Sequence, residues 1–181
     1  MDTVYAILVI AAIVGFVYLY RKGARAANKA INRKVLYKPE YEESVNLRKS
    51  LTLTTTASIP DILRELDAHV TTADELPVAF KGAIYEQSRS ADKVVYMFGN
   101  KAAPRTFETA VMFSTKNGKT QAVFVVQRWK ENSGLMLGQD ALKTLRKEVR
   151  AAFMAIHDAA VAVGTEPALQ VPDEATEAAE S

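Results

Sequence analysis

The sequence predicts an α+β protein with an N-terminal transmembrane helix, and three patterns lead to this prediction. An uncharged apolar run over residues 4–20 is followed at once by basic residues. Four segments of strand character then follow one another with turn sequences between them. An apolar helical period covers residues 139–163, after the strands. We therefore expect one membrane helix, and an antiparallel sheet that packs on a long C-terminal helix.

The predicted anchor spans residues 1–20. Its uncharged core and flanks reach roughly 27 Å as a helix, close to the ~30 Å of a hydrocarbon core. Tyr5 lies near one end and Tyr18 and Tyr20 near the other, where aromatic rings with a polar tip favour the membrane interface. A buried core helix is disfavoured because the run lacks a polar face. A cleaved signal peptide is disfavoured because the basic residues follow the apolar run instead of preceding it.

Charge predicts the orientation of this anchor. Asp2 is the only acidic residue before Glu40, and seven basic residues follow the apolar run: Arg21, Lys22, Arg25, Lys29, Arg33, Lys34 and Lys38. Positive residues are retained on the cytoplasmic side. We expect the N-terminus to face outward, and the remaining chain to lie in the cytoplasm.

The basic segment also predicts contact with the bilayer. Residues 21–47 are expected to form a basic juxtamembrane helix and a linker, in which the cations at 21, 25, 29 and 33 recur every four residues. Arg21, Lys22, Arg25, Lys29, Arg33 and Lys34 are therefore our candidates for contact with anionic headgroups. In the alternative interpretation, these charges only set the topology.

Composition excludes several classes of function. The net charge is +2, but residues 39–181 contain 16 basic and 20 acidic residues, which disfavours a nucleic-acid-binding domain. No cysteine is present, which excludes disulfides, thiolate zinc sites and thiol catalysis. His69 and His157 are the only histidines and have no ligand cluster around them. We predict no catalytic residue, metal or cofactor, and a protein that is not an enzyme.

The elements of the domain, expected over residues 48–164, follow from local signals. A Thr-rich alternating strand is predicted over 51–57, and Ser58 then caps a helix with Pro60 and Asp61 in its first turn. Pro39 is expected to end any helix before a polar connector over 37–44. Gly164 is expected to stop the final helix, and residues 165–181 to form a disordered acidic tail. The four strands are expected over residues 80–88, 93–98, 105–114 and 119–129, with Asn117-Gly118 as a hairpin turn.

The opening of this domain resembles that of the START-like (SRPBCC) superfamily. The resemblance rests on a Thr-rich strand that runs into Ala57-Ser-Ile-Pro-Asp-Ile-Leu-Arg-Glu-Leu66, and on the final helix in the place of the closing helix of that superfamily. It covers residues 48–163 and implies a helix-grip fold, in which the sheet wraps around the closing helix. The superfamily often carries a ligand cavity, but this chain has fewer strands and lacks a clear second short helix.

Two predicted strands have apolar residues on both faces. In 119–129 we expect Val123, Val125 and Trp129 to point away from the first apolar face, and Val95 and Met97 to do so in 93–98. These five residues form our candidate apolar contact face, unless they are simply covered core.

The sequence favours a membrane-anchored, non-enzymatic binding or scaffold module. It would present a cytoplasmic α+β domain to a membrane-associated complex, with a protein partner or a second copy of itself on the apolar face. The alternative is a carrier or sensor of an apolar small molecule or lipid in a helix-grip cavity. An enzyme with a non-obvious site is the third interpretation.

Overall fold

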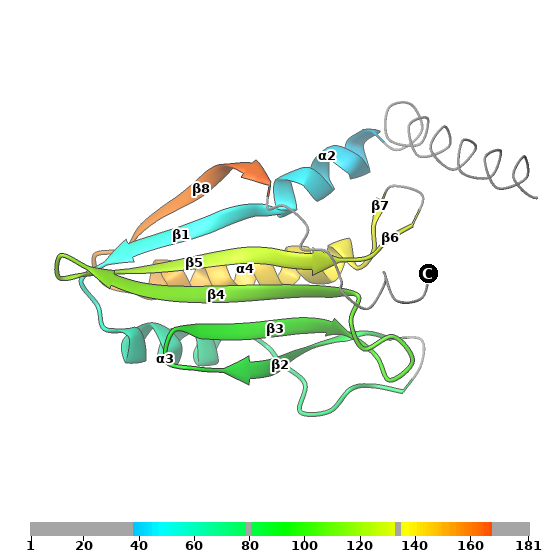
Figure 1. The fold of residues 1–181 in the computed structure, drawn as a ribbon, viewed down its shortest axis with the longest axis horizontal. Helices are drawn as coiled ribbons and strands as arrows, with labels where there is room; N and C mark the ends of the chain where they lie inside the picture. Colours follow the sequence, from blue (N-terminus) through cyan, green and yellow to red (C-terminus); the bar gives the residue numbers. More distant parts are fainter. Residues whose placement is uncertain (1–37, 79–80, 133–134, 168–181) are drawn as a thin grey trace, which may run out of the picture.

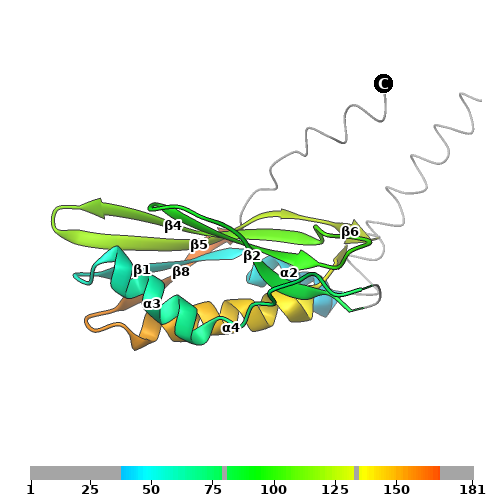
Figure 2. The same ribbon diagram turned by 90° about the horizontal axis from the view of Figure 1, so that it is seen from below.

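The computed structural model describes residues 38–78, 81–132 and 135–167 (Figure 1). This part of the chain is an α+β fold with a six-stranded antiparallel sheet in the order β2-β3-β4-β5-β1-β8, and with three helices. Helices α3 and α4 lie on one side of the sheet (Figure 2). The α+β class and the antiparallel sheet are therefore confirmed.

The four-strand meander is also confirmed, with boundary shifts of a few residues. Its strands are β2 (Ala83–Arg89), β3 (Lys93–Gly99), β4 (Phe107–Lys116) and β5 (Lys119–Trp129). The tight turn between β4 and β5 holds Asn117 at φ 54° and Gly118 at φ 71°. This left-handed pair matches the twist of a hairpin, which is why Asn-Gly predicts the turn so well.

The first strand and its helix follow the local signals. Strand β1 (Lys49–Thr55) pairs with β5, with Leu51 opposite Phe124. Helix α3 (Ile59–His69) begins after Ser58, whose hydroxyl accepts a hydrogen bond from the Asp61 amide at 3.4 Å. Ile62 and Leu66 of α3 are fully buried. The capped start and the apolar stripe of this helix are therefore as predicted.

Helix α4 (Gln139–Ala155) begins where the sequence predicts it and packs along the sheet. Its inward stripe is fully buried and consists of Leu142, Leu145, Val149, Ala152 and Phe153. The same core includes Leu51 of β1, Val111 of β4 and Phe124 of β5. This packing of α4 on the sheet is the main hydrophobic core.

The prediction that this helix continues to residue 163 is wrong. The chain turns at Asp158, which has a φ of 57°, and Ala160–Pro167 forms strand β8 beside β1. The Ala-Val alternation from Ala160 suits a strand as well as a helix. Strand β1 offers an edge on the side away from β5, and pairing of β8 with this edge selects the strand. Gly164 therefore lies within a strand, and the ordered chain continues past residue 165.

The polar connector predicted over residues 37–44 is instead largely helical. Helix α2 (Lys38–Leu47) contains Pro39 as its second residue. A proline in the first turn costs no helical hydrogen bond, so Pro39 begins this helix instead of ending one. Ser44 and Leu47 are buried, so α2 is packed onto the domain.

Two short strands, β6 (Glu131–Asn132) and β7 (Leu135–Met136), form a separate hairpin.

The predicted transmembrane helix lies outside the described residues. Within the described ranges, none of the helices combines the length and the hydropathy needed to span a bilayer. The anchor over residues 1–20 therefore stays a prediction from the sequence. The predicted acidic tail also lies outside the described residues from position 168 onward.

Candidate binding face

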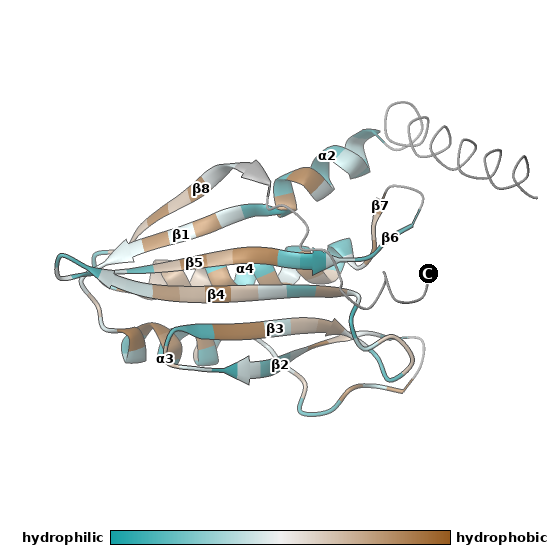
Figure 3. Cartoon of the chain, in the orientation of Figure 1, coloured by the Kyte–Doolittle hydropathy of each residue, from teal (hydrophilic) through white to brown (hydrophobic). Residues whose placement is uncertain are grey.

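The side of the sheet opposite α3 and α4 carries a group of apolar side chains. Register places Val123 of β5 beside Met112 of β4, and Val125 beside Ala110. Ala110 in turn lies opposite Val95 of β3. We call this side the outer face, and its apolar cluster consists of Val95, Met97, Ala110, Met112, Val123 and Val125. Figure 3 shows the hydrophobic stretches of β3 and β5 that contribute to it.

Burial within this cluster decreases from its centre to its margin. Ala110, Met97 and Val95 are buried, although none of them belongs to the core beneath α4. Met112 is 39% exposed, and Val123 and Val125 are half-buried. Neighbouring side chains in the sheet shield Val95, Met97 and Ala110, while Met112, Val123 and Val125 keep surface in contact with solvent. The outer face thus presents an apolar surface that no described helix covers.

Polar and charged groups border this cluster. Glu108 lies opposite Met97 on one side and Arg128 on the other, and Arg105 approaches the Glu108 carboxylate at 3.7 Å. Lys93 lies opposite Met112 at the far end. An apolar centre with a charged border is the usual anatomy of a protein-binding surface.

Tyr85 of β2 attaches a loop to the same face. Its hydroxyl donates to the carbonyl of Pro104 at 2.9 Å and lies 3.1 Å from the sulfur of Met97. Burial raises the pKa of the Tyr85 phenol, so it stays protonated and remains a donor near neutral pH. The loop between β3 and β4 is therefore held beside the apolar cluster.

Trp129 does not share the outer face with the other four predicted residues. The pairing of β4 with β5 shifts between Glu108 and Thr109, because one residue of β5 bulges, and Trp129 then lies opposite Phe107. Phe107 and Trp129 both belong to the core beneath the helices. The bulge reverses the expected alternation of side chains after Val126, so Trp129 points into the core. The prediction that Trp129 belongs to the contact face is therefore wrong. The guanidinium of Arg48 stacks over the indole at 4.6 Å from its ring centroid.

Two further residues of the outer face were not among the predicted candidates. Ala110 and Met112 lie in a segment that was predicted as a strand. Their alternation with the buried Thr109, Val111 and Phe113 was the signal that could have found them. The predicted membrane contacts Arg21, Lys22, Arg25, Lys29, Arg33 and Lys34 lie outside the described residues.

Helix α2 is fixed to the domain by specific polar contacts. The guanidinium of Arg146 in α4 donates to the carbonyls of Leu47 and Lys49, where α2 ends and β1 begins. Lys143 lies 2.5 Å from the Glu43 carboxylate on the other side of the contact. Desolvation lowers the pKa of Arg146, yet the group remains charged near neutral pH. Helix α2 therefore has a defined position relative to the sheet.

The space between α4 and the sheet is filled by side chains. Leu145, Val149 and Phe153 of the helix and Phe124 of the sheet have 0% exposure. A side chain that lined a cavity large enough for water would retain accessible surface. These described side chains therefore leave no room for a ligand at the place where a helix-grip cavity would lie.

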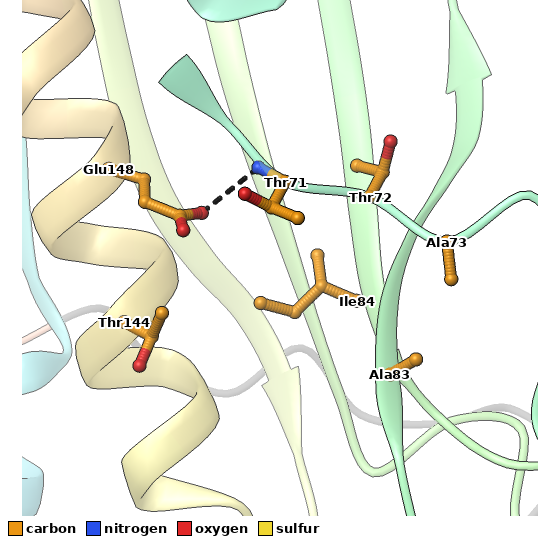
Figure 4. Close-up of a pocket in the computed structure, with 7 residues that line it drawn as sticks. All are labelled: Thr71, Thr72, Ala73, Ala83, Ile84, Thr144 and Glu148. Atoms are coloured by element: carbon orange, nitrogen blue, oxygen red, sulfur yellow. Dashed lines mark hydrogen bonds between the residues drawn. The ribbon is translucent and has the colours of Figure 1, made fainter.

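An open groove lies beside α4 instead, between the chain after α3 and the first residues of β2 (Figure 4). It has a volume of about 350 Å³ and its lining consists of Thr71, Thr72, Ala73, Ala83, Ile84, Thr144 and Glu148. The Glu148 carboxylate accepts a hydrogen bond from the Thr71 amide at 3.1 Å. This carboxylate attaches the loop to α4, and its pairing explains its position without a ligand.

The two histidines lie apart on the surface. His69 Nδ1 is 2.9 Å from the carbonyl oxygen of Glu65, and His157 lies beside Asp158 at the turn before β8. No group of three or more metal-ligating side chains occurs within the described ranges.

No family model, curated protein or solved structure matches this chain.

Proposed function

We propose that this protein is a membrane-anchored, non-enzymatic module that presents its α+β domain on the cytoplasmic side to a protein of a membrane-associated complex. The observation that carries the proposal is the outer face, whose apolar cluster has a charged border and no described helix over it. The partner would contribute an apolar surface of its own. Val123, Val125 and Met112 would make the first contacts because they retain exposed surface.

The sequence supports the anchor and the orientation. The uncharged run over 4–20 suits a single span, and the seven cations that follow it favour the cytoplasmic side. The cations from Arg21 to Lys34 would lie against anionic headgroups. Because Arg146 attaches the end of α2 to α4, this helix would belong to the presented domain.

The packing beneath α4 favours this function over the carrier alternative. A carrier of an apolar molecule needs an enclosed, largely apolar cavity of some hundreds of Å³. The buried side chains of α4 and the sheet fill the corresponding space here. The resemblance to the START-like superfamily would then concern the order of the elements and not its ligand cavity.

The test compares the full chain with two variants that carry a new carboxylate on β5. Val125→Asp places a charge in the apolar cluster, and Gln121→Asp places the same charge on the same face of the same strand, at an exposed position outside the cluster. All three proteins are expected in the membrane fraction after alkaline extraction. One partner should co-purify in stoichiometric amount with wild type and Gln121→Asp, and be reduced at least tenfold with Val125→Asp.

Three results would contradict the proposal. Release of the intact chain by alkaline extraction would show that residues 1–20 do not anchor it in the membrane. Equal recovery of the partner with both variants would show that the partner does not bind the outer face. Unfolding of Val125→Asp, seen as a red shift of the Trp129 emission, would show that this face is part of the core.

A further inference from the structure

The two edges of the sheet differ in how they are protected. At the β2 edge, the Ala73 amide donates to the Ile84 carbonyl at 2.8 Å, so the chain after α3 occupies part of this edge. The same strand carries Arg89, whose guanidinium binds both Asp67 and Glu86. Backbone cover and edge charges are two ordinary devices that prevent strand pairing between molecules.

Over residues 160–165 the β8 edge has neither device within the part of the chain that the structure describes, and Glu166 and Pro167 follow at the end of the strand. Residues 159–165 contain no charged residue and no proline. Ala160 and Ala162 are exposed, and Val163 is 51% exposed. Strand β8 pairs with β1 on one side and is the last strand of the sheet on the other, as Figure 1 shows. No described strand pairs with the outward N–H and C=O groups of residues 160–165, so a further strand could bind there.

We propose that this edge pairs with the β8 edge of a second copy of the chain, in antiparallel orientation about a two-fold axis. A two-fold axis places the β8 strands of the two copies opposite one another. Because residues 159–165 are uncharged, this pairing brings no like charges together within that stretch. A strand selected for a different partner would be expected to carry side chains that distinguish it, whereas this one offers only alanine, valine, glycine and threonine between Asp158 and Glu166.

The regular part of β8 and its flanking charges define the register. Pairing with β1 is regular from residue 160 to 163, and then shifts between Lys49 and Leu51 where β8 bulges. A two-fold axis at Val161 places Ala160 opposite Ala162 of the other copy, and Asp158 opposite Gly164. An axis one residue further would place Asp158 opposite Glu166 and oppose two carboxylates. We therefore place the axis at Val161. Pairing at β8 involves neither the outer face nor the membrane anchor.

Cysteine cross-linking tests the pairing directly, since the chain has no cysteine of its own. In the double variant Ala160→Cys/Ala162→Cys, each new thiol faces its counterpart across the two-fold axis, within the ~5.5 Å between Cα atoms that a disulfide requires. The control double variant Ala151→Cys/Ala155→Cys has two exposed sites on α4. Both are used as purified full chains in mild detergent with a mild oxidant, and non-reducing electrophoresis measures the covalent dimer.

We expect the β8 variant to become mainly covalent dimer, at a rate at least tenfold above that of the α4 control, and to return to monomer on reduction. A monomeric β8 variant, or dimer formation at the rate of the control, would overturn the proposal. Each single β8 variant should form little dimer. A dimer from Ala162→Cys alone would retain the edge pairing and refute the register at Val161. Unchanged Trp129 emission before oxidation verifies that the variants are folded, and these outcomes do not depend on whether the outer face binds a partner.

Discussion

Truncation of Phe153 to alanine measures how tightly the space beneath α4 is filled. The Phe153 side chain has 0% exposure and belongs to the core shared by α4 and the sheet. Removal of a buried phenyl ring forfeits its transfer free energy and leaves a void that the surroundings close only in part. We expect Phe153→Ala to lower the free energy of unfolding by about 3–5 kcal/mol.

The adjacent residue supplies a matched control. Met154 lies on the same helix and is 64% exposed. Met154→Ala removes a side chain that is mostly in water already, and alanine is the best helix former. We expect this change to alter stability by about 0.5 kcal/mol or less.

Urea unfolding of the full chain in mild detergent is the appropriate assay. Trp129 is the only tryptophan and is buried in the same core, so its fluorescence reports the unfolding of the domain. With a slope of about 2 kcal/mol per molar urea, Phe153→Ala should lower the midpoint by about 1.5–2.5 M. Equal midpoints for the two variants would refute the packed interior. They would return the carrier alternative to consideration, because a ring that lines a cavity contributes less to stability.

Two further predictions concern contacts that hold single elements in place. Arg146→Ala leaves the carbonyls of Leu47 and Lys49 without this donor, and should lower the free energy of unfolding by about 2–3 kcal/mol. Amide exchange should become faster in α2 and at the start of β1, and Arg146→Lys should restore only part of the lost stability. Unchanged exchange in α2 would contradict the proposed attachment. Ser58→Ala removes the cap of α3 and should cost about 1 kcal/mol at neutral pH, whereas Ser58→Asp should retain most of the stability. The Ser58 hydroxyl lowers the pKa of Asp61, so the carboxyl resonance of Asp61 should titrate at higher pH in Ser58→Ala. A lowered carboxyl pKa stabilises the fold at pH values above the unfolded pKa, near 3.8. The difference in stability between wild type and Ser58→Ala should therefore shrink as the pH falls through the lowered pKa. A stability difference that grows in acid would contradict this assignment.

Local signals in the sequence determined much of this fold. Asn117-Gly118 specifies a left-handed turn, and the Ser58-Ile-Pro-Asp61 sequence specifies a helix start, because each depends on the conformation of a few adjacent residues. The inward stripe of α4 follows from helical periodicity alone. The apolar character of Val95, Met97, Val123 and Val125 was likewise visible in the sequence, since alternation along a strand assigns them to one face.

Tertiary structure decided the elements whose local signals were ambiguous or misleading. Residues 160–163 fit a helix or a strand, and the free edge of β1 selects the strand. Pro39 is compatible with the end or the beginning of a helix, and the contacts of Ser44, Leu47 and Arg146 select the beginning. Trp129 depends on a single bulged residue, which periodicity cannot reveal. In each case contacts between residues distant in the chain outweigh a local preference of a few tenths of a kcal/mol to about 1 kcal/mol.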